Sequence, residues 1–103
     1  MIIYNTTYHV DNSTINAFIE WVKGYYISNA VKSGDLKNPR LSLIMVQEDD
    51  ENHKSYSLQF EVDSVDVLQS WYGTNGRTLV TEFEAKFAQK VVGFTTIMSV
   101  VEL

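Results

Sequence analysis

Three residues of this sequence have side chains suited to chemistry on a small molecule: Asn5, His9 and Trp71. The amide of Asn5 can orient a substrate oxygen, the imidazole of His9 can accept a proton near neutral pH, and the indole of Trp71 can stack on a planar ring. Each also has a purely structural explanation: a hydrogen-bonded strand residue, an exposed strand-end histidine beside Asp11, and a core or interface residue. Because the sequence supplies no specific partner for His9, we favour these structural explanations.

A second set of polar residues follows a two-residue period. Asn5, Thr7 and His9 alternate along one apparent strand, and Ser57, Gln59 and Glu61 alternate along another. Alternate residues of a strand share a face, so these six side chains line one surface if the two strands are neighbours. The sequence therefore predicts a polar ligand-binding surface, on which Glu61 can pair with His9 only in one particular register.

The hydrophobic spacing predicts the elements that position these residues. Alternation or short apolar runs predict strands over 2–10, 41–48, 55–62 and 91–101. Helical spacing follows two groups of capping residues, at 11–14 and 63–64, and predicts helices over 15–30 and 65–87. The glycines of 73–76 predict a bent or briefly broken second helix, since each interior glycine costs about 1 kcal/mol relative to alanine.

This order of elements is typical of the α+β, ferredoxin-like βαββαβ arrangement in a single domain over 1–103. Right-handed crossovers put both helices on one face of a four-stranded antiparallel sheet, with the strand order 4-1-3-2. The first and third strands are then central, and their polar surface lies on the face without helices.

The two strands at the sheet edges are apolar on both sides, which an exposed edge rarely tolerates. We expect Ile44, Val46, Val91, Ile97 and Val101 to form an apolar rim around the polar centre. A second copy of the chain would cover this face and enclose a chamber between the two sheets. The alternative is a solvated sheet face whose edges are covered by other parts of the same chain.

Four segments resemble a family of short Bacteroidetes proteins known as a domain of unknown function: 1–7, 20–23, 55–60 and 87–94. The resemblance implies the dimeric α/β barrel type of fold and brings no assigned activity. The wider group includes cofactor-free monooxygenases and haem-degrading enzymes, some of which use an Asn on the first strand and a Trp on the second helix. Asn5 and Trp71 match by position, but 79–87 holds no histidine that could bind haem, so we expect no cofactor.

Composition excludes several kinds of partner. Eight Lys and Arg against 13 Asp and Glu give a net charge of −5, and the basic residues are scattered, which opposes binding to nucleic acid. The chain has no cysteine, and the acidic run 48–51 lacks the spacing of a calcium loop, so we expect no metal site. Without a basic leader or a long apolar run, the expected location is the cytoplasm and not the membrane.

We therefore expect a homodimeric ligand-binding or structural module with a chamber between facing sheets, which binds an unidentified small molecule if it binds one. The alternative is a cofactor-independent monooxygenase-like enzyme or a related small-molecule enzyme. An aromatic group in the first helix, Trp21, Tyr25 and Tyr26, is interpreted as packing and not as a stacking platform.

Overall fold

The computed structural model describes residues 1–45 and 51–103. Along the chain its elements are β1 (Ile2–Asp11), η1 (Asn12–Thr14), α1 (Ile15–Trp21), η2 (Val22–Tyr26), α2 (Ile27–Ala30), β2 (Lys37–Leu43), β3 (His53–Val62), α3 (Val65–Trp71), η3 (Tyr72–Gly76), α4 (Arg77–Phe87), η4 (Ala88–Lys90) and β4 (Val91–Ser99). The predicted residue Val46 and most of the acidic run 48–51 lie outside the described residues.

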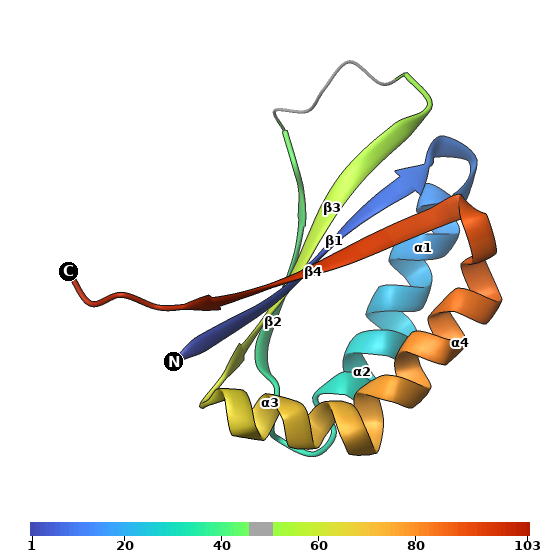
Figure 1. Ribbon diagram of the computed structural model, residues 1–103. Coiled ribbons are helices and arrows are strands. Elements are labelled where there is room, and N and C mark those ends of the chain that lie inside the picture. Colours follow the sequence, from blue (N-terminus) through green and yellow to red (C-terminus); the bar gives the residue numbers. More distant parts are fainter. Residues whose placement is uncertain (46–50) are drawn as a thin grey trace.

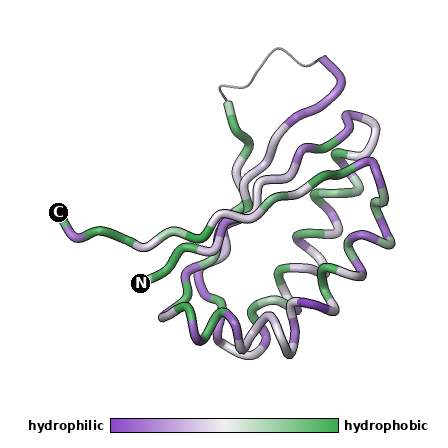
Figure 2. The backbone as a smooth tube through the Cα atoms, in the orientation of Figure 1, coloured by the Kyte–Doolittle hydropathy of each residue, from purple (hydrophilic) through white to green (hydrophobic). Residues whose placement is uncertain are grey.

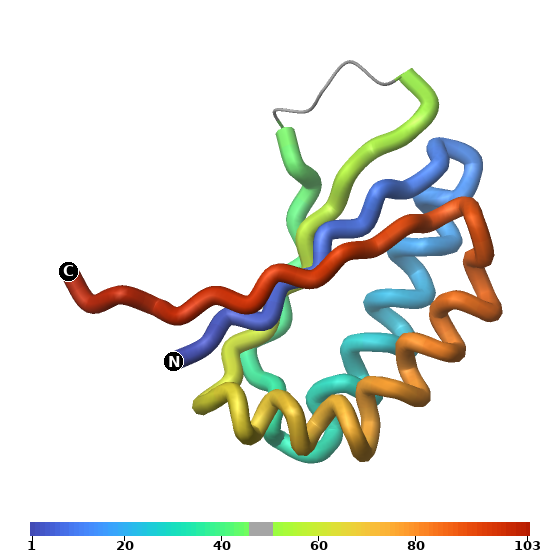
Figure 3. Tube along the Cα trace, in the orientation of Figure 1, coloured from blue at the N-terminus to red at the C-terminus, as the bar shows by residue number. Residues whose placement is uncertain are grey.

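The four strands form one antiparallel sheet in the order β2-β3-β1-β4. All helices lie on one side of this sheet, and the other side is open (Figure 1). The predicted ferredoxin-like fold and its strand order are thus confirmed. The trace places β1 beside β4, with both chain ends at the same end of the sheet (Figure 3).

The first helical segment, η1 to α2, begins at a cap that the sequence predicts. The carboxylate of Asp11 accepts a hydrogen bond from the backbone N–H of Ser13 at 2.9 Å, which satisfies a first-turn donor. The helix then passes from α1 through a π-helical turn, η2, into α2. Gly34 follows with φ of 86°, the left-handed conformation expected of a glycine after a helix end.

The second helical segment, α3 to α4, is continuous through its glycines. Ser64 caps α3 by accepting a hydrogen bond from the N–H of Val67 at 3.2 Å. The segment 73–76 does not break the helix but forms most of a second π-helical turn, η3, which leads directly into α4. A π-helical turn contains one residue more than an α-helical turn. The apolar side chains before and after η3 therefore lie on the same face of the helix.

The core lies between the sheet and the helices. On β1 and β3 the larger side chains of the predicted alternation point to this side: Tyr4, Tyr8, Val10, Tyr56, Leu58, Phe60 and Val62 are all buried. Phe18 and Trp71 meet them from the helices and are completely inaccessible to solvent. The amphipathic patterns of the central strands and of the first helix are therefore correct. The second helix buries Leu79, Phe83 and Phe87 as its spacing predicts, but Val65 and Tyr72, which its spacing also assigns to the apolar stripe, are exposed.

The edge strands differ from the prediction. Strand β2 begins at Lys37, earlier than expected, and β4 ends at Ser99. The predicted faces of β4 were also exchanged, because Val91 pairs with Val10 and is buried against the helices. Ile97 shares that side, while Val92, Phe94 and Met98 share the open face with the polar residues of β1. The tail after β4 continues the hydrophobic stretch (Figure 2), with Val100 and Val101 exposed.

Candidate functional site

The open face of the sheet gathers the six predicted ligand-binding residues. The register of β1 and β3 sets Asn5 opposite Gln59 and Thr7 opposite Ser57. Glu61 lies opposite Ile3, six residues along β1 from His9. At about 3.4 Å per residue this separation is roughly 20 Å, so Glu61 is not the partner of His9.

Hydrogen bonds join the central polar side chains to one another. The amide oxygen of Asn5 accepts a bond from the Ser57 hydroxyl at 2.5 Å, and its nitrogen donates to the Thr7 hydroxyl at 3.2 Å. Asn5 is only 8% exposed even though it lies on the open face. Its amide is thus held by one residue of β1 and one of β3, which fits the structural explanation. On this face Gln59 is the side-chain amide without a hydrogen bond to the described residues.

His9 lies at the far end of the same face. Its Nδ1 is 3.1 Å from the hydroxyl of Ser55, and its ring stacks on that of His53 with the centroids 4.5 Å apart. The four residue steps from Asn5 to His9 span roughly 14 Å of strand, so the two side chains cannot act on one reacting atom.

Trp71 does not join this surface. It packs edge-on against Tyr4, whose ring lies on the helix side of β1, with the ring centroids 5.8 Å apart. Its indole N–H donates to the carbonyl of Ala30 at 2.8 Å, which satisfies an open carbonyl at the end of α2. The sheet separates Trp71 from Asn5 and His9, so the prediction of a stacking wall beside them is wrong, and the three residues do not form one site.

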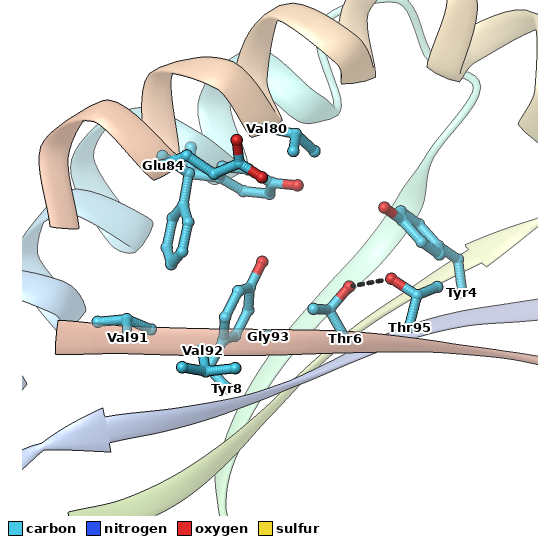
Figure 4. Close-up of a pocket in the computed structure, with 11 residues that line it drawn as sticks. Tyr4, Thr6, Tyr8, Val80, Glu84, Val91, Val92, Gly93 and Thr95 are labelled. Carbon is cyan, nitrogen blue, oxygen red and sulfur yellow. Dashed lines mark hydrogen bonds between the residues drawn. The ribbon is translucent and has the colours of Figure 1, made fainter. Parts of the chain in front are cut away.

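A pocket of about 290 Å³ lies instead on the helix side, between α4 and the strands β1 and β4 (Figure 4). Its inner wall consists of buried residues, chiefly Tyr4, Tyr8, Tyr26 and Phe83. Its exposed residues come from α4 and β4 and include Glu84, Gly93 and Thr95. The pocket therefore opens to solvent between the helix and the edge strand.

The hydroxyl groups of Tyr4, Tyr8 and Tyr26 come together in the inner part of this pocket. Burial raises the pKa of all three phenols, and the neighbouring phenols of Tyr8 and Tyr4 raise the pKa of Tyr26 further. Thr6 and Thr95 add two more hydroxyls, with their oxygens 3.4 Å apart. The pocket thus presents neutral hydrogen-bonding groups within an aromatic wall.

Small residues on the edge strand create the opening. At Gly93, an added Cβ would lie 3.0 Å from Cδ1 of Tyr8, so the glycine lets the tyrosine ring approach the backbone of β4. Figure 4 shows Val92 directed to the opposite side of β4 from the pocket centre. The sequence signal for the pocket was the pair Gly93 and Thr95 between two larger residues of the same face, Val91 and Ile97. Tyr26, whose helical spacing predicts packing alone, also lines the pocket.

Two further properties of the described residues bear on function. Within residues 1–45 and 51–103, no three His, Asp or Glu side chains gather closely enough to hold a metal ion. In the same ranges, every helix is too short or too polar to cross a bilayer.

The model of the family described as Domain of unknown function (DUF4286) matches residues 1–101. The chain belongs to this family. The description of DUF4286 names no activity, and a search of curated proteins finds no match.

Solved structures share the fold of this DUF4286 chain. A candidate antibiotic biosynthesis monooxygenase from Deinococcus radiodurans has a TM-score of 0.72 at 12% identity, over 100% of this chain and 95% of that one. An ethyl tert-butyl ether d (ethd) family protein from Bacillus halodurans has a TM-score of 0.72 at 17% identity, over 98% of this chain and 100% of that one. A dimeric ferredoxin-like protein from an uncultured marine organism has a TM-score of 0.65 at 14% identity, over 100% and 97%. At these identities the likeness shows the fold alone.

Proposed function

We propose that this chain is a homodimeric binding module in which two copies pack through the open faces of their sheets. The observation that carries the proposal is the exposure of Phe94 (61%), Val92 (59%) and Met98 (39%) beside a polar row that is largely hydrogen-bonded to itself. Side chains of this size on one sheet face are typical of a surface that another protein covers.

Charge supports a second copy as the partner. The strand pairings place two cations, Lys37 and Arg40, and one carboxylate, Glu61, along the open face. Lys37 also forms an ion pair at 3.3 Å with Asp63, just after β3, so the charges of this face balance. The chain as a whole has a net charge of −5. Two such faces meet without net repulsion, whereas most other surfaces of two copies would repel each other.

The size of the face also fits a dimer. Strand β1 has 10 residues. With about 3.4 Å per residue and about 4.8 Å between strands, four strands cover roughly 34 by 19 Å, or roughly 600 Å². This area does not include the additional surface of side chains that protrude from the sheet. A stable interface buries about 800 Å² per partner, which is close to this estimate.

In such a dimer the polar residues of both copies border a chamber. Asn5, Thr7, His9, Ser57, Gln59 and Glu61 remain our proposed ligand-binding residues there. Gln59 is the best candidate for direct contact, since its amide has no hydrogen-bond partner among the described residues.

Light scattering at micromolar concentration tests the dimer. Phe94→Lys places a charge on the open face and is expected to weaken dimerisation by at least about 3 kcal/mol, or roughly 100-fold in Kd. Ile97→Lys is the matched control, because Ile97 is 53% exposed on the same strand but on the helix side. A monomeric wild-type chain, or equal dissociation of both variants, would contradict the proposal.

An oxygenase-like enzyme is the alternative function. It is supported by the pocket on the helix side, which holds buried hydroxyls and an acidic residue at its mouth, Glu84. Oxygen uptake with hydroxylated aromatic compounds, without added metal or cofactor, separates the two functions. Uptake that stops in a Glu84→Gln variant would favour the enzyme, and binding without uptake would favour the module.

Two narrower expectations stay predictions: an origin in Bacteroidetes and a cytoplasmic location.

A further inference from the structure

We propose that the pocket between α4 and the strands β1 and β4 binds a neutral, two-ring aromatic molecule that carries a hydroxyl or carbonyl oxygen. The pocket lies on the opposite side of the sheet from the proposed dimer face, so this inference does not depend on the dimer.

The volume of the pocket sets the size of the ligand. Engineered apolar cavities of about 150 Å³ hold one benzene molecule. The pocket measures about 290 Å³, which is space for two fused rings and their substituents. Larger ligands would extend past the mouth into solvent.

The walls set the shape and polarity of the ligand. Tyr8 and Phe83 contact each other with ring centroids 5.0 Å apart and form an aromatic wall suited to a flat ring system. The hydroxyls of Tyr4, Thr6 and Thr95 lie around the same space (Figure 4), and Tyr26 also lines the pocket. These hydroxyls can donate to or accept from ligand oxygens. A purely apolar ligand would leave some of these groups without a partner, which costs binding free energy.

The charged groups around the pocket determine the net charge of the ligand. The pocket lining includes no lysine, arginine or histidine, and its one ionisable acid is Glu84 at the mouth. Burial raises the pKa of Tyr8 and Tyr26, so the phenols stay protonated at neutral pH. An anionic ligand would meet a carboxylate and find no cation, and is therefore disfavoured.

The test compares three probes of similar shape by titration calorimetry or NMR: 2-naphthol, naphthalene and 2-naphthoate. We expect 2-naphthol to bind, naphthalene to bind more weakly, and 2-naphthoate to bind at least about tenfold more weakly than 2-naphthol because of its charge. Equal binding of 2-naphthol and 2-naphthoate, or no binding of 2-naphthol at millimolar concentration, would overturn the proposal.

Two neighbouring tyrosines supply a matched pair of variants. Tyr26→Phe removes a pocket hydroxyl and keeps the ring, and we expect it to weaken 2-naphthol binding about fivefold while naphthalene binding changes little. Tyr25→Phe is the control, because Tyr25 is exposed and donates its hydroxyl to Glu82 outside the pocket. Equal effects of the two variants on 2-naphthol would contradict the assignment.

A filling variant decides the matter if Tyr26→Phe fails to fold. Thr95 is exposed at the mouth, so Thr95→Phe adds volume to the pocket without entering the buried core. We expect it to weaken binding of 2-naphthol and naphthalene alike by at least about tenfold. Unchanged binding of both probes would show that they bind elsewhere and would overturn the proposal.

Discussion

The position of Trp71 depends on the absence of a side chain at Gly76. A Cβ added at Gly76 would lie 2.5 Å from Cζ3 of Trp71 and 2.9 Å from Cε3, closer than real Cβ contacts allow. The indole cannot easily move away, because it is completely buried and its N–H donates to Ala30. We therefore expect Gly76→Ala to destabilise the fold even though alanine is the better helix former.

The magnitude follows from two opposing terms. Alanine in place of a helical glycine stabilises by about 1 kcal/mol, while overpacking in a core costs about 1–3 kcal/mol and a broken buried hydrogen bond about 1–3 kcal/mol more. The net expectation is a loss of about 1–5 kcal/mol in the free energy of unfolding, and each kcal/mol lowers Tm by about 4–8 °C for a domain of this size.

Gly73→Ala is the matched control for this prediction. Gly73 belongs to the same π-helical turn, but a Cβ there would meet no atom within 4 Å. We expect this variant to be unchanged or more stable by up to about 1 kcal/mol. Urea unfolding followed by circular dichroism measures both. If Gly76→Ala is as stable as Gly73→Ala, Trp71 is not locked in the core and the reasoning that removes it from a binding role fails.

Three other experiments test local features. Ser64→Ala should cost about 1 kcal/mol in thermal unfolding because it removes the cap of α3. Hydrogen bonding to Ser13 lowers the pKa of Asp11 below its ordinary 3.8. Its contribution to stability is therefore present above that pH and lost as the pH falls through the folded-state pKa, and Asp11→Asn should flatten the acid limb measured between about pH 5 and about pH 2. A double-mutant cycle of Asn5→Ala and Ser57→Ala should give a coupling of about 1 kcal/mol in urea unfolding, and no coupling would mean that their hydrogen bond does not order the open face.

The fold could be predicted because its signals are local and repeated. On β3, Tyr56, Leu58 and Phe60 alternate with polar residues, so burial of one face fixes the direction of every side chain on the strand. The helix caps Asp11 and Ser64 likewise act on the backbone within three residues of themselves. Such patterns determine the order of the elements and the helix-covered face without any long-range information.

The candidate sites depended on information that the sequence does not carry. Both faces of β4 are apolar, so its hydrophobic pattern cannot say which side meets the helices, and only pairing with β1 decides this. Register likewise decides that His9 lies opposite Ser55 and not Glu61. The pocket depends on tertiary packing, since Tyr26 meets the strand residues Tyr4 and Tyr8 only after the helix packs on the sheet.

The alternation of β1 explains why the two proposed binding surfaces can be tested separately. Tyr4, Thr6 and Tyr8 face the pocket, while Asn5 and Thr7 face the open side, so neighbouring residues of one strand serve opposite surfaces. The same holds on β4, where a substitution on one face leaves the side chains of the other face in place. A change in oligomeric state from the open face with unchanged binding of 2-naphthol would therefore mean that the sheet separates the two surfaces energetically as well as spatially. Parallel loss of both would mean that the strand transmits strain between them, because closely packed layers shift together.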